Sequence, residues 1–159
     1  MKSNCQIVGV EANYNLHEFA SRMIKLNGIR NYVINNHILY SDNSPVSFEI
    51  NTDNNTVGKI NKKSYNATTL IKYESGSTFN DILKKYSIDS DFILISDIEG
   101  AEAFFIFHEA NLNHCKMILI ELHEFENYSV AMMVTKLVEK GFKMIDRYGF
   151  CFVFEKNSI

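Results

Sequence analysis

The sequence is poor in several residue types that define specialised classes of protein. Its 159 residues include one proline, no tryptophan and three cysteines, Cys5, Cys115 and Cys151. Three cysteines cannot form a closed set of disulfides, and their spacing matches no zinc site. We therefore expect reduced thiols in a cytoplasmic protein. The seven glycines never form G-x-G, and the chain has no G-x-S-x-G, P-loop or H-E-x-x-H motif, which excludes the enzyme classes that depend on them.

The chain also lacks an excess of positive charge and a long apolar run. Its net charge is −3 and its pI is near 5.9, so we expect neither nucleic acid nor an anionic membrane as a partner. No run approaches the roughly 20 apolar residues of a membrane span, and the N-terminus does not read as a secretory signal. With 46% hydrophobic residues, the length suits one globular domain over residues 1–159.

What the chain does have is an alternation of short apolar runs and amphipathic segments. This pattern predicts an α/β fold with a mostly parallel sheet and a closing antiparallel hairpin around Gly149. Capping residues predict the starts of three helices, namely Asn15 with Glu18, Thr78, and Ser129. A fourth helix should follow Gly100. The expected strands cover residues 6–10, 31–35, 45–50, 68–74, 91–96, 116–122, 143–148 and 150–156, with a polar loop at 51–66.

Acidic residues stand where three of the predicted strands end. Glu11, Asp97 and Glu121 each follow an apolar run, Glu99 and Glu102 come soon after Asp97, and His123 comes two residues after Glu121. Ligands of open parallel sheets bind beyond the carboxyl ends of the strands, so we expect these side chains at a ligand-binding rim. An acid in Glu11's position is typical of residues that accept ribose hydroxyls. The alternative is that each acid begins a turn, caps a helix or lies in a solvated loop.

Five blocks of the sequence carry a resemblance to a known family. In order, they read VGVEANYNLHEFASRMIKLNGIRNYVINNHILYSD, STFNDIL, ILISDIEGAE, ILIELHE and LVEKGF. Their order and spacing resemble the FkbM family of S-adenosylmethionine-dependent methyltransferases, and the D-I-E-G-A-E block followed by E-L-H is the most specific part.

The resemblance implies a Rossmann-like class I methyltransferase sheet, S-adenosylmethionine as cofactor, and O-methylation of a small molecule or glycan. It assigns the cofactor ribose to Glu11 and the adenine pocket to His37, Ile38 and Leu39. Asp97 would lie beside the transferred methyl group. The implied catalytic residues, which surround the methyl group and the acceptor, are Asp97, Glu99, Glu121 and His123.

Two departures from the family pattern qualify this reading. Ile95 stands where the family often has lysine, and the family's first strand with its glycine-rich cofactor turn is absent. We therefore expect an N-terminally incomplete domain, and an inactive methyltransferase-like domain or binding module remains the alternative. Because the absent strand is central in the family, we predict that residues 6–10 pair directly with residues 92–96, since buried strands would otherwise leave backbone groups unpaired.

The chemistry itself leaves two readings open. In the first, His123 is the general base that takes the acceptor's proton, oriented by Asp97 or Glu121. In the second, the reaction is metal-assisted, because Asp97, Glu99, Glu121 and His123 offer ligands compatible with Mg²⁺ or Mn²⁺. The acceptor and the oligomeric state cannot be read from the sequence.

Overall fold

The computed structural model describes residues 5–51, 58–60, 68–73, 75–108 and 111–157. The chain divides into two compact units, one formed by residues 1–39 with 44–76 and the other by residues 40–43 with 77–159. Whether they form the single domain expected from the sequence stays a prediction.

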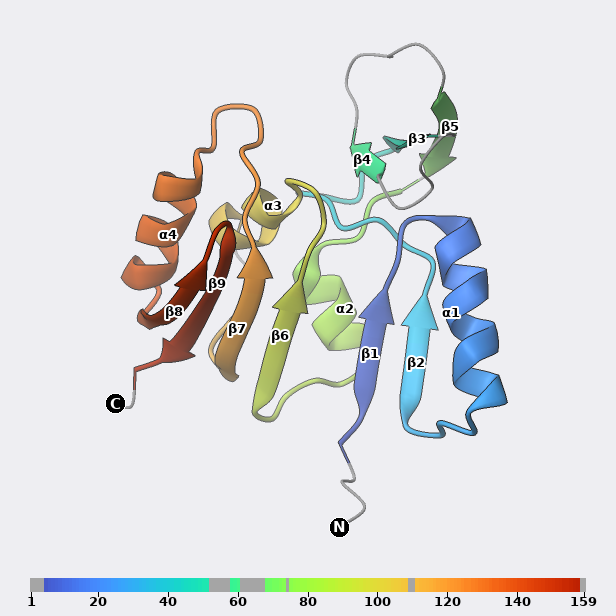
Figure 1. Ribbon diagram of the computed structural model, residues 1–159, viewed down its shortest axis with the longest axis horizontal. Coiled ribbons are helices and arrows are strands. Elements are labelled where there is room, and N and C mark those ends of the chain that lie inside the picture. Colours follow the sequence, from blue (N-terminus) through green and yellow to red (C-terminus); the bar gives the residue numbers. More distant parts are fainter. Residues whose placement is uncertain (1–4, 52–57, 61–67, 74, 109–110, 158–159) are drawn as a thin grey trace. The chain divides into compact units, whose positions relative to one another are not determined.

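The first unit begins with a parallel β-α-β element (Figure 1). Strand β1 (Ile7–Val10) leads into helix α1 (Tyr14–Leu26), which returns the chain to β2 (Tyr32–Asn35). The two strands pair in parallel from Ile7 opposite Tyr32 to Val10 opposite Asn35. A parallel pair needs such a crossover, which is why two apolar runs separated by an amphipathic helix predict it correctly.

The start of α1 differs from the prediction. The N-cap is Asn13, whose side-chain oxygen accepts the amide of Asn15 at 3.0 Å, and Asn15 already lies within the helix. Glu18 takes no part in a capping box there but accepts the hydroxyl of Tyr14 at 2.6 Å. Both asparagines, two residues apart, have a side chain suited to capping, and the structure uses the earlier one.

The first unit also contains a three-stranded antiparallel sheet in the order β4-β3-β5. Its strands are β3 (Val46–Asn51), β4 (Gly58–Ile60) and β5 (Thr68–Tyr73). Strand β4 falls inside the predicted loop at 51–66, so the loop prediction is wrong for residues 58–60; the rest of that loop beyond residue 51 lies outside the described residues. The strand forms because Ile60 packs as a buried residue in register with Phe48 on β3.

The second unit is built on a mixed four-stranded sheet in the order β6-β7-β9-β8. Strand β6 (Phe92–Ser96) is parallel to β7 (Cys115–Glu121), while β9 (Cys151–Lys156) is antiparallel both to β7 and to β8 (Phe142–Tyr148). The α/β class and the closing hairpin are confirmed. The prediction of a mostly parallel sheet is not confirmed. Among the described strands, the pairs β1-β2 and β6-β7 are parallel, and the other pairs are antiparallel.

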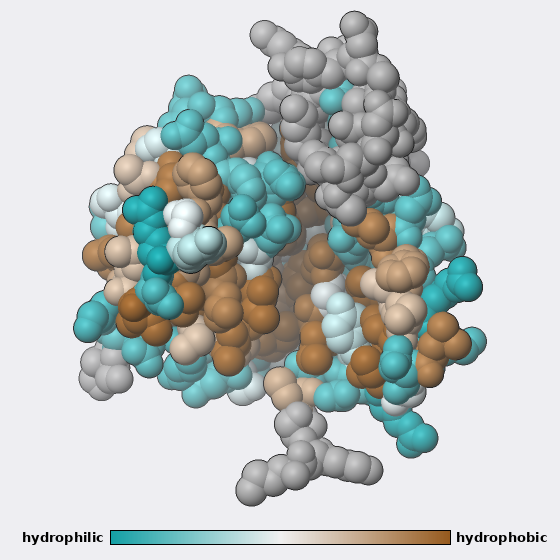
Figure 2. All heavy atoms as spheres, viewed as in Figure 1, coloured by the Kyte–Doolittle hydropathy of each residue, from teal (hydrophilic) through white to brown (hydrophobic). Residues whose placement is uncertain are grey.

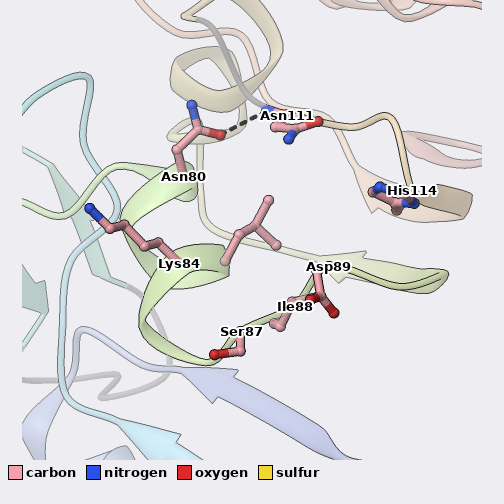
Figure 3. A pocket seen from close by; sticks show the side chains of 8 residues that line it. Asn80, Lys84, Ser87, Ile88, Asp89, Asn111 and His114 are labelled. Atoms are coloured by element: carbon pink, nitrogen blue, oxygen red, sulfur yellow. Dashed lines mark hydrogen bonds between the residues drawn. The ribbon is translucent and has the colours of Figure 1, made fainter.

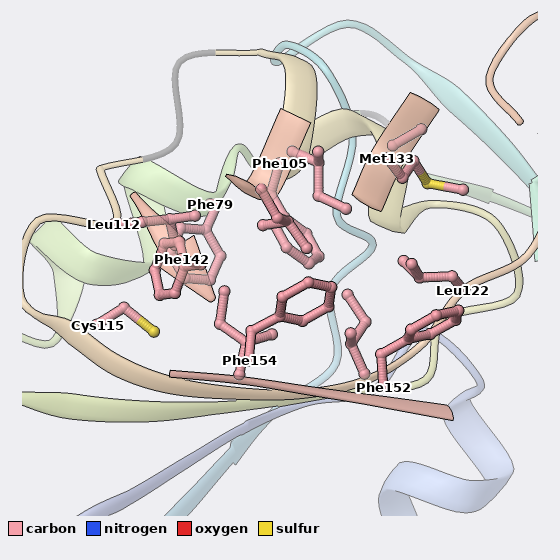
Figure 4. Packing of buried hydrophobic residues seen from close by; sticks show 14 of the residues in the cluster. Phe79, Phe105, Leu112, Cys115, Leu122, Met133, Phe142, Phe152 and Phe154 are labelled. Atoms are coloured by element: carbon pink, nitrogen blue, oxygen red, sulfur yellow. The ribbon is translucent and has the colours of Figure 1, made fainter. Parts of the chain in front are cut away.

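Three helices cover one face of this sheet: α2 (Phe79–Lys85), α3 (Glu102–Phe107) and α4 (Val130–Glu139). The predicted caps are confirmed at Thr78, which forms a capping box with Asp81, and at Ser129. Between the helices and the strands lies a core rich in phenylalanine, in which the rings of Phe105, Phe152 and Phe154 gather (Figure 4). No helix in the described ranges is both long and apolar enough to cross a membrane.

The opposite face of the sheet carries exposed apolar side chains. Ile93 is 61% exposed and Ile95 is 76% exposed, and Figure 2 shows apolar side chains gathered over this sheet. The sequence predicts β6 as a central strand buried on both faces, but the structure makes it the edge strand of its sheet.

The predicted pairing of β1 with β6 is wrong. Among the described strands, β1 pairs with β2 and β6 pairs with β7, in separate sheets. The argument from unpaired backbone groups fails here because each strand already has one partner, and an edge strand needs no more than one.

Candidate active site

The loop that leaves β6 has an unusual backbone. Glu99 (φ 55°) and Gly100 (φ 101°) are consecutive residues in left-handed conformations, and Gly100 is buried. Glycine adopts such angles freely, whereas glutamate does so at a cost of about 1–2 kcal/mol. Left-handed non-glycine residues concentrate at functional sites, and Glu99 is itself one of the predicted catalytic residues.

The carboxylate of Glu102 holds this loop in place. Its Oε1 accepts the amide of Ile98 at 2.7 Å and its Oε2 accepts the amide of Gly100 at 2.7 Å. The side chain is completely buried at the first turn of α3. Burial raises the pKa of the Glu102 carboxyl, while the amide hydrogen bonds and the neighbouring His123 act in the opposite direction.

His123 lies among three carboxylates. Its Nδ1 is 3.6 Å from Oε1 of Glu102, and its Nε2 is 3.7 Å from Oε2 of Glu99 and 3.8 Å from Oε1 of Glu121. Glu121 ends β7 and His123 follows two residues later, with the buried Leu122 between them. The alternation along the extended chain therefore places both side chains on one side, as the sequence predicts.

Asp97 and Cys151 complete the rim at this end of the sheet. Asp97 is exposed directly after β6, and Cys151 is paired in register with Glu121 across β7 and β9. The pKa of the Cys151 thiol is raised by desolvation first, and then by the negative charges of Glu121 and Asp97. The four acids around His123 thus form a strongly negative site. In the described part of the chain, Glu99, Glu102 and Glu121 form ion pairs within 4.0 Å with His123 alone.

The geometry offers a different candidate cation set from the predicted one. Asp97, Glu102 and His123 each supply one ligand atom, and these atoms lie within 4.8 Å of one another. Glu102 takes the place that the sequence analysis gave to Glu99 and Glu121. Both oxygens of Glu102 already accept backbone amides, so the set is better suited to hydrogen bonding than to binding a metal.

The predicted cofactor residues lie in the first unit. Glu11 follows β1, and its Oε1 accepts the amide of Asn13 at 2.7 Å, which leaves Oε2 for another donor. Asn36 donates to the backbone oxygen of Glu11 at 2.9 Å and ties the ends of β1 and β2 together. Ile38 is only 3% exposed, so its side chain belongs to the interior in this structure.

The remaining predicted adenine residues, His37 and Leu39, flank Ile38 in the segment after β2 and are half-buried. They and Glu11 all follow the carboxyl ends of β1 and β2, which is the end where ligands of parallel strands bind. Their roles stay predictions.

A hollow of about 340 Å³ lies at the other end of the sheet (Figure 3). It is lined by α2 residues such as Lys84, by Ser87 to Asp89 before β6, and by Asn111 and His114 before β7. These segments precede the strands, whereas Asp97 and Glu121 stand at their carboxyl ends. The hollow is therefore separate from the acidic rim.

The structure thus brings together all four predicted catalytic residues, Asp97, Glu99, Glu121 and His123, within the second unit. It also includes Glu102, which the sequence groups with Asp97 and Glu99 but which was not among the predicted catalytic residues. An acid in the first turn of a helix is ordinarily explained by its favourable interaction with the helix dipole. That explanation does not predict the contacts of Glu102 with the loop and with His123.

Comparison with protein families identifies the family of the chain. The model of the methyltransferase FkbM domain matches residues 1–144. The chain belongs to this family. Neither the comparison with curated proteins nor that with solved structures returned a match. Family membership indicates a methyltransferase in general, and it confirms the resemblance drawn from the sequence blocks.

Proposed function

We propose that this FkbM domain is an S-adenosylmethionine-dependent O-methyltransferase of the Rossmann-like class I, acting on a hydroxyl of a small molecule or glycan. The observation that carries the proposal is the placement of His123 between Glu99 and Glu121 at the carboxyl ends of β6 and β7. A basic nitrogen at a ligand-binding rim is what deprotonation of a hydroxyl acceptor requires.

S-adenosylmethionine, when bound, would supply a methyl group from its sulfonium for displacement by the acceptor oxygen. The acceptor's proton passes to Nε2 of His123, and the adjacent carboxylates stabilise the resulting imidazolium. Asp97 lies beside this position and holds the acceptor or the cationic group by charge. Orientation of the reacting groups supplies much of the remaining acceleration.

The residues present fit one half of the cofactor better than the other. At the end of β1, Oε2 of Glu11 accepts no hydrogen bond from the residues that the structure describes, which suits it to the ribose hydroxyls. The sequence offers no glycine-rich turn for the methionine half. A non-catalytic binding module is the second candidate function, because an acceptor at Glu11 supports binding of a ligand without requiring methyl transfer.

A methyl-transfer assay with a panel of hydroxylated acceptors tests the proposal. With S-adenosylmethionine labelled in its methyl group, we expect transfer to at least one acceptor and a loss of about 10²–10⁴-fold in His123→Gln. The matched control is His114→Gln, because His114 is exposed at the other end of the same sheet. Cofactor binding without transfer to any acceptor would favour the binding module.

A metal-assisted reaction with Mg²⁺ or Mn²⁺ is the remaining alternative. The same assay decides it, because transfer that is abolished by a chelator and restored by either ion would require a metal. Transfer that is indifferent to chelator would leave His123 and the carboxylates as the reacting groups.

A further inference from the structure

We propose that Glu102, and neither Asp97 nor Glu121, is the positioning residue of His123: it holds the ring proton on Nδ1 and leaves Nε2 free to accept a proton. What Nε2 then accepts rests on the proposed function. The proton's location is a property of the chain alone.

Glu102 is the most firmly fixed acid of the site. Its side chain is completely buried and each of its oxygens accepts a backbone amide at 2.7 Å. Amide donors at both oxygens favour the ionised form of this carboxyl group against the effect of burial, because the hydroxyl oxygen of a protonated one is a weaker acceptor. The loop from Ile98 to Gly100 and this carboxylate therefore fix one another.

The buried nitrogen of His123 faces this carboxylate. Nδ1 is buried and has no hydrogen-bond partner among the described residues, and Oε1 of Glu102 is 3.6 Å away. With the proton on Nδ1, a shift of about half an ångström gives an ordinary charge-assisted hydrogen bond. With the proton on Nε2, a lone pair on Nδ1 would face a carboxylate oxygen, and the buried nitrogen would stay unsatisfied.

Glu99 and Glu121 pull the proton the other way, towards Nε2, at 3.7 and 3.8 Å. Their side chains are 40% and 36% exposed, whereas that of Glu102 is 0% exposed. Water screens the two exposed charges, and the buried charge acts through a medium of lower dielectric constant. Because the three distances are nearly equal, the buried charge of Glu102 has the strongest effect on the position of the ring proton.

The ring-nitrogen spectrum of ¹⁵N-histidine-labelled protein tests the proposal without cofactor or acceptor. It is recorded with the ring neutral, and His123→Gln identifies the signals of His123 among the five histidines. We expect the proton of His123 on Nδ1 in the unmodified chain. A proton on Nε2 would overturn the proposal whatever any variant does.

Two variants then identify the residue responsible. Glu102→Gln should shift most of the His123 population to the Nε2–H form, whereas Glu121→Gln, its control, should leave Nδ1 protonated. If Glu121→Gln moves the proton and Glu102→Gln does not, Glu102 is not the positioning residue. The backbone amide spectrum of each variant shows whether the fold is kept. If Glu102→Gln does not fold, Glu102→Asp takes its place, with a smaller shift in the same direction expected because its carboxylate is drawn back from Nδ1 by one methylene.

Kinetics separate this proposal from the proposed function. If a methyl acceptor is found, Glu102→Gln should lower kcat at least tenfold with the KM for the acceptor changed less than twofold, since Glu102 does not touch the acceptor. A rise in KM with kcat unchanged would contradict positioning. If no acceptor is methylated, the proposed function fails while the spectrum still decides the position of the proton.

Discussion

The ring of Phe125 lies directly against the α carbon of Gly100. A β carbon built on Gly100 would come within 2.8 Å of Cδ2 of Phe125. The backbone of Gly100 is also left-handed, with φ 101°. The turn that aims the acids of the site thus depends on a glycine for two independent reasons, one conformational and one steric.

Substitution of Gly100 should therefore be costly. We expect Gly100→Ala to lower the free energy of unfolding by roughly 2–4 kcal/mol, through left-handed strain plus the clash with Phe125. Gly149→Ala is the matched control, because Gly149 (φ 60°) is left-handed but has nothing within 4 Å of its would-be β carbon. Its cost should stay near 1 kcal/mol. Urea unfolding measures both, and equal costs would mean that the Phe125 contact is unimportant.

Glu99 should lower the stability of the fold while contributing to methyl transfer. Glu99→Gly relieves a left-handed glutamate (φ 55°) and should raise the free energy of unfolding by up to about 1 kcal/mol, because the strain removed exceeds the added chain entropy. Glu99→Gln keeps the strain and should leave stability within about 0.5 kcal/mol. Both variants lose the charge 3.7 Å from His123, so both should lower methyl transfer. A destabilised Glu99→Gly would show that the backbone there is unstrained.

The exposed face of β6 can be tested by comparing two isoleucines on neighbouring strands. Ile95 is 76% exposed on β6 and Ile118 is completely buried on β7. We expect Ile95→Thr to change the free energy of unfolding by less than about 0.5 kcal/mol and Ile118→Thr to lower it by about 2–4 kcal/mol. A large cost at Ile95 would mean that this face is covered in solution.

Cys115 gives the fold a dependence on alkaline pH. Burial raises the pKa of its thiol from 9.0 to about 11, because the thiolate would be desolvated beside the core. A raised pKa means that the thiol's contribution to stability is complete below pH 9 and is lost as the pH rises from about 9 to about 11. The stability difference between the unmodified chain and Cys115→Ala should therefore shrink over this range in thermal unfolding. Cys5→Ala, at an exposed position, is the control for the removal of a thiol.

Much of the fold follows from local patterns that the sequence displays. Thr78 with Asp81 and Ser129 begin helices as predicted, because a capping side chain satisfies amides of the first turn wherever tertiary packing allows. The shift of the α1 cap from Asn15 to Asn13 is a choice between two residues of equal propensity. Strand pairing is harder to predict, because apolar runs identify strands without identifying their neighbours. For this reason the predicted pairing of β1 with β6 was wrong.

The residues of the site could be predicted from the sequence to a similar extent. The ends of β6 and β7 place Asp97, Glu99, Glu121 and His123 near one another because side chains after parallel neighbours share a rim. The role of Glu102 was not predicted because its contact with His123 joins separate segments, and because its bonds to the amides of residues 98 and 100 depend on the left-handed turn between them. No spacing rule in the sequence reports such a contact.

Binding of the cofactor product is the measurement that tests the account most directly. In calorimetric titration with S-adenosylhomocysteine, we expect measurable binding by the unmodified chain and at least tenfold weaker binding by Glu11→Gln, because a hydrogen bond to a charged group contributes about 1.5–3 kcal/mol. Glu11→Gln can keep the bond from the Asn13 amide, so the local backbone should persist. Glu18→Gln, on the exposed side of α1, is the control and should bind like the unmodified chain. No heat at high ligand concentration, or equal binding by Glu11→Gln, would contradict the account.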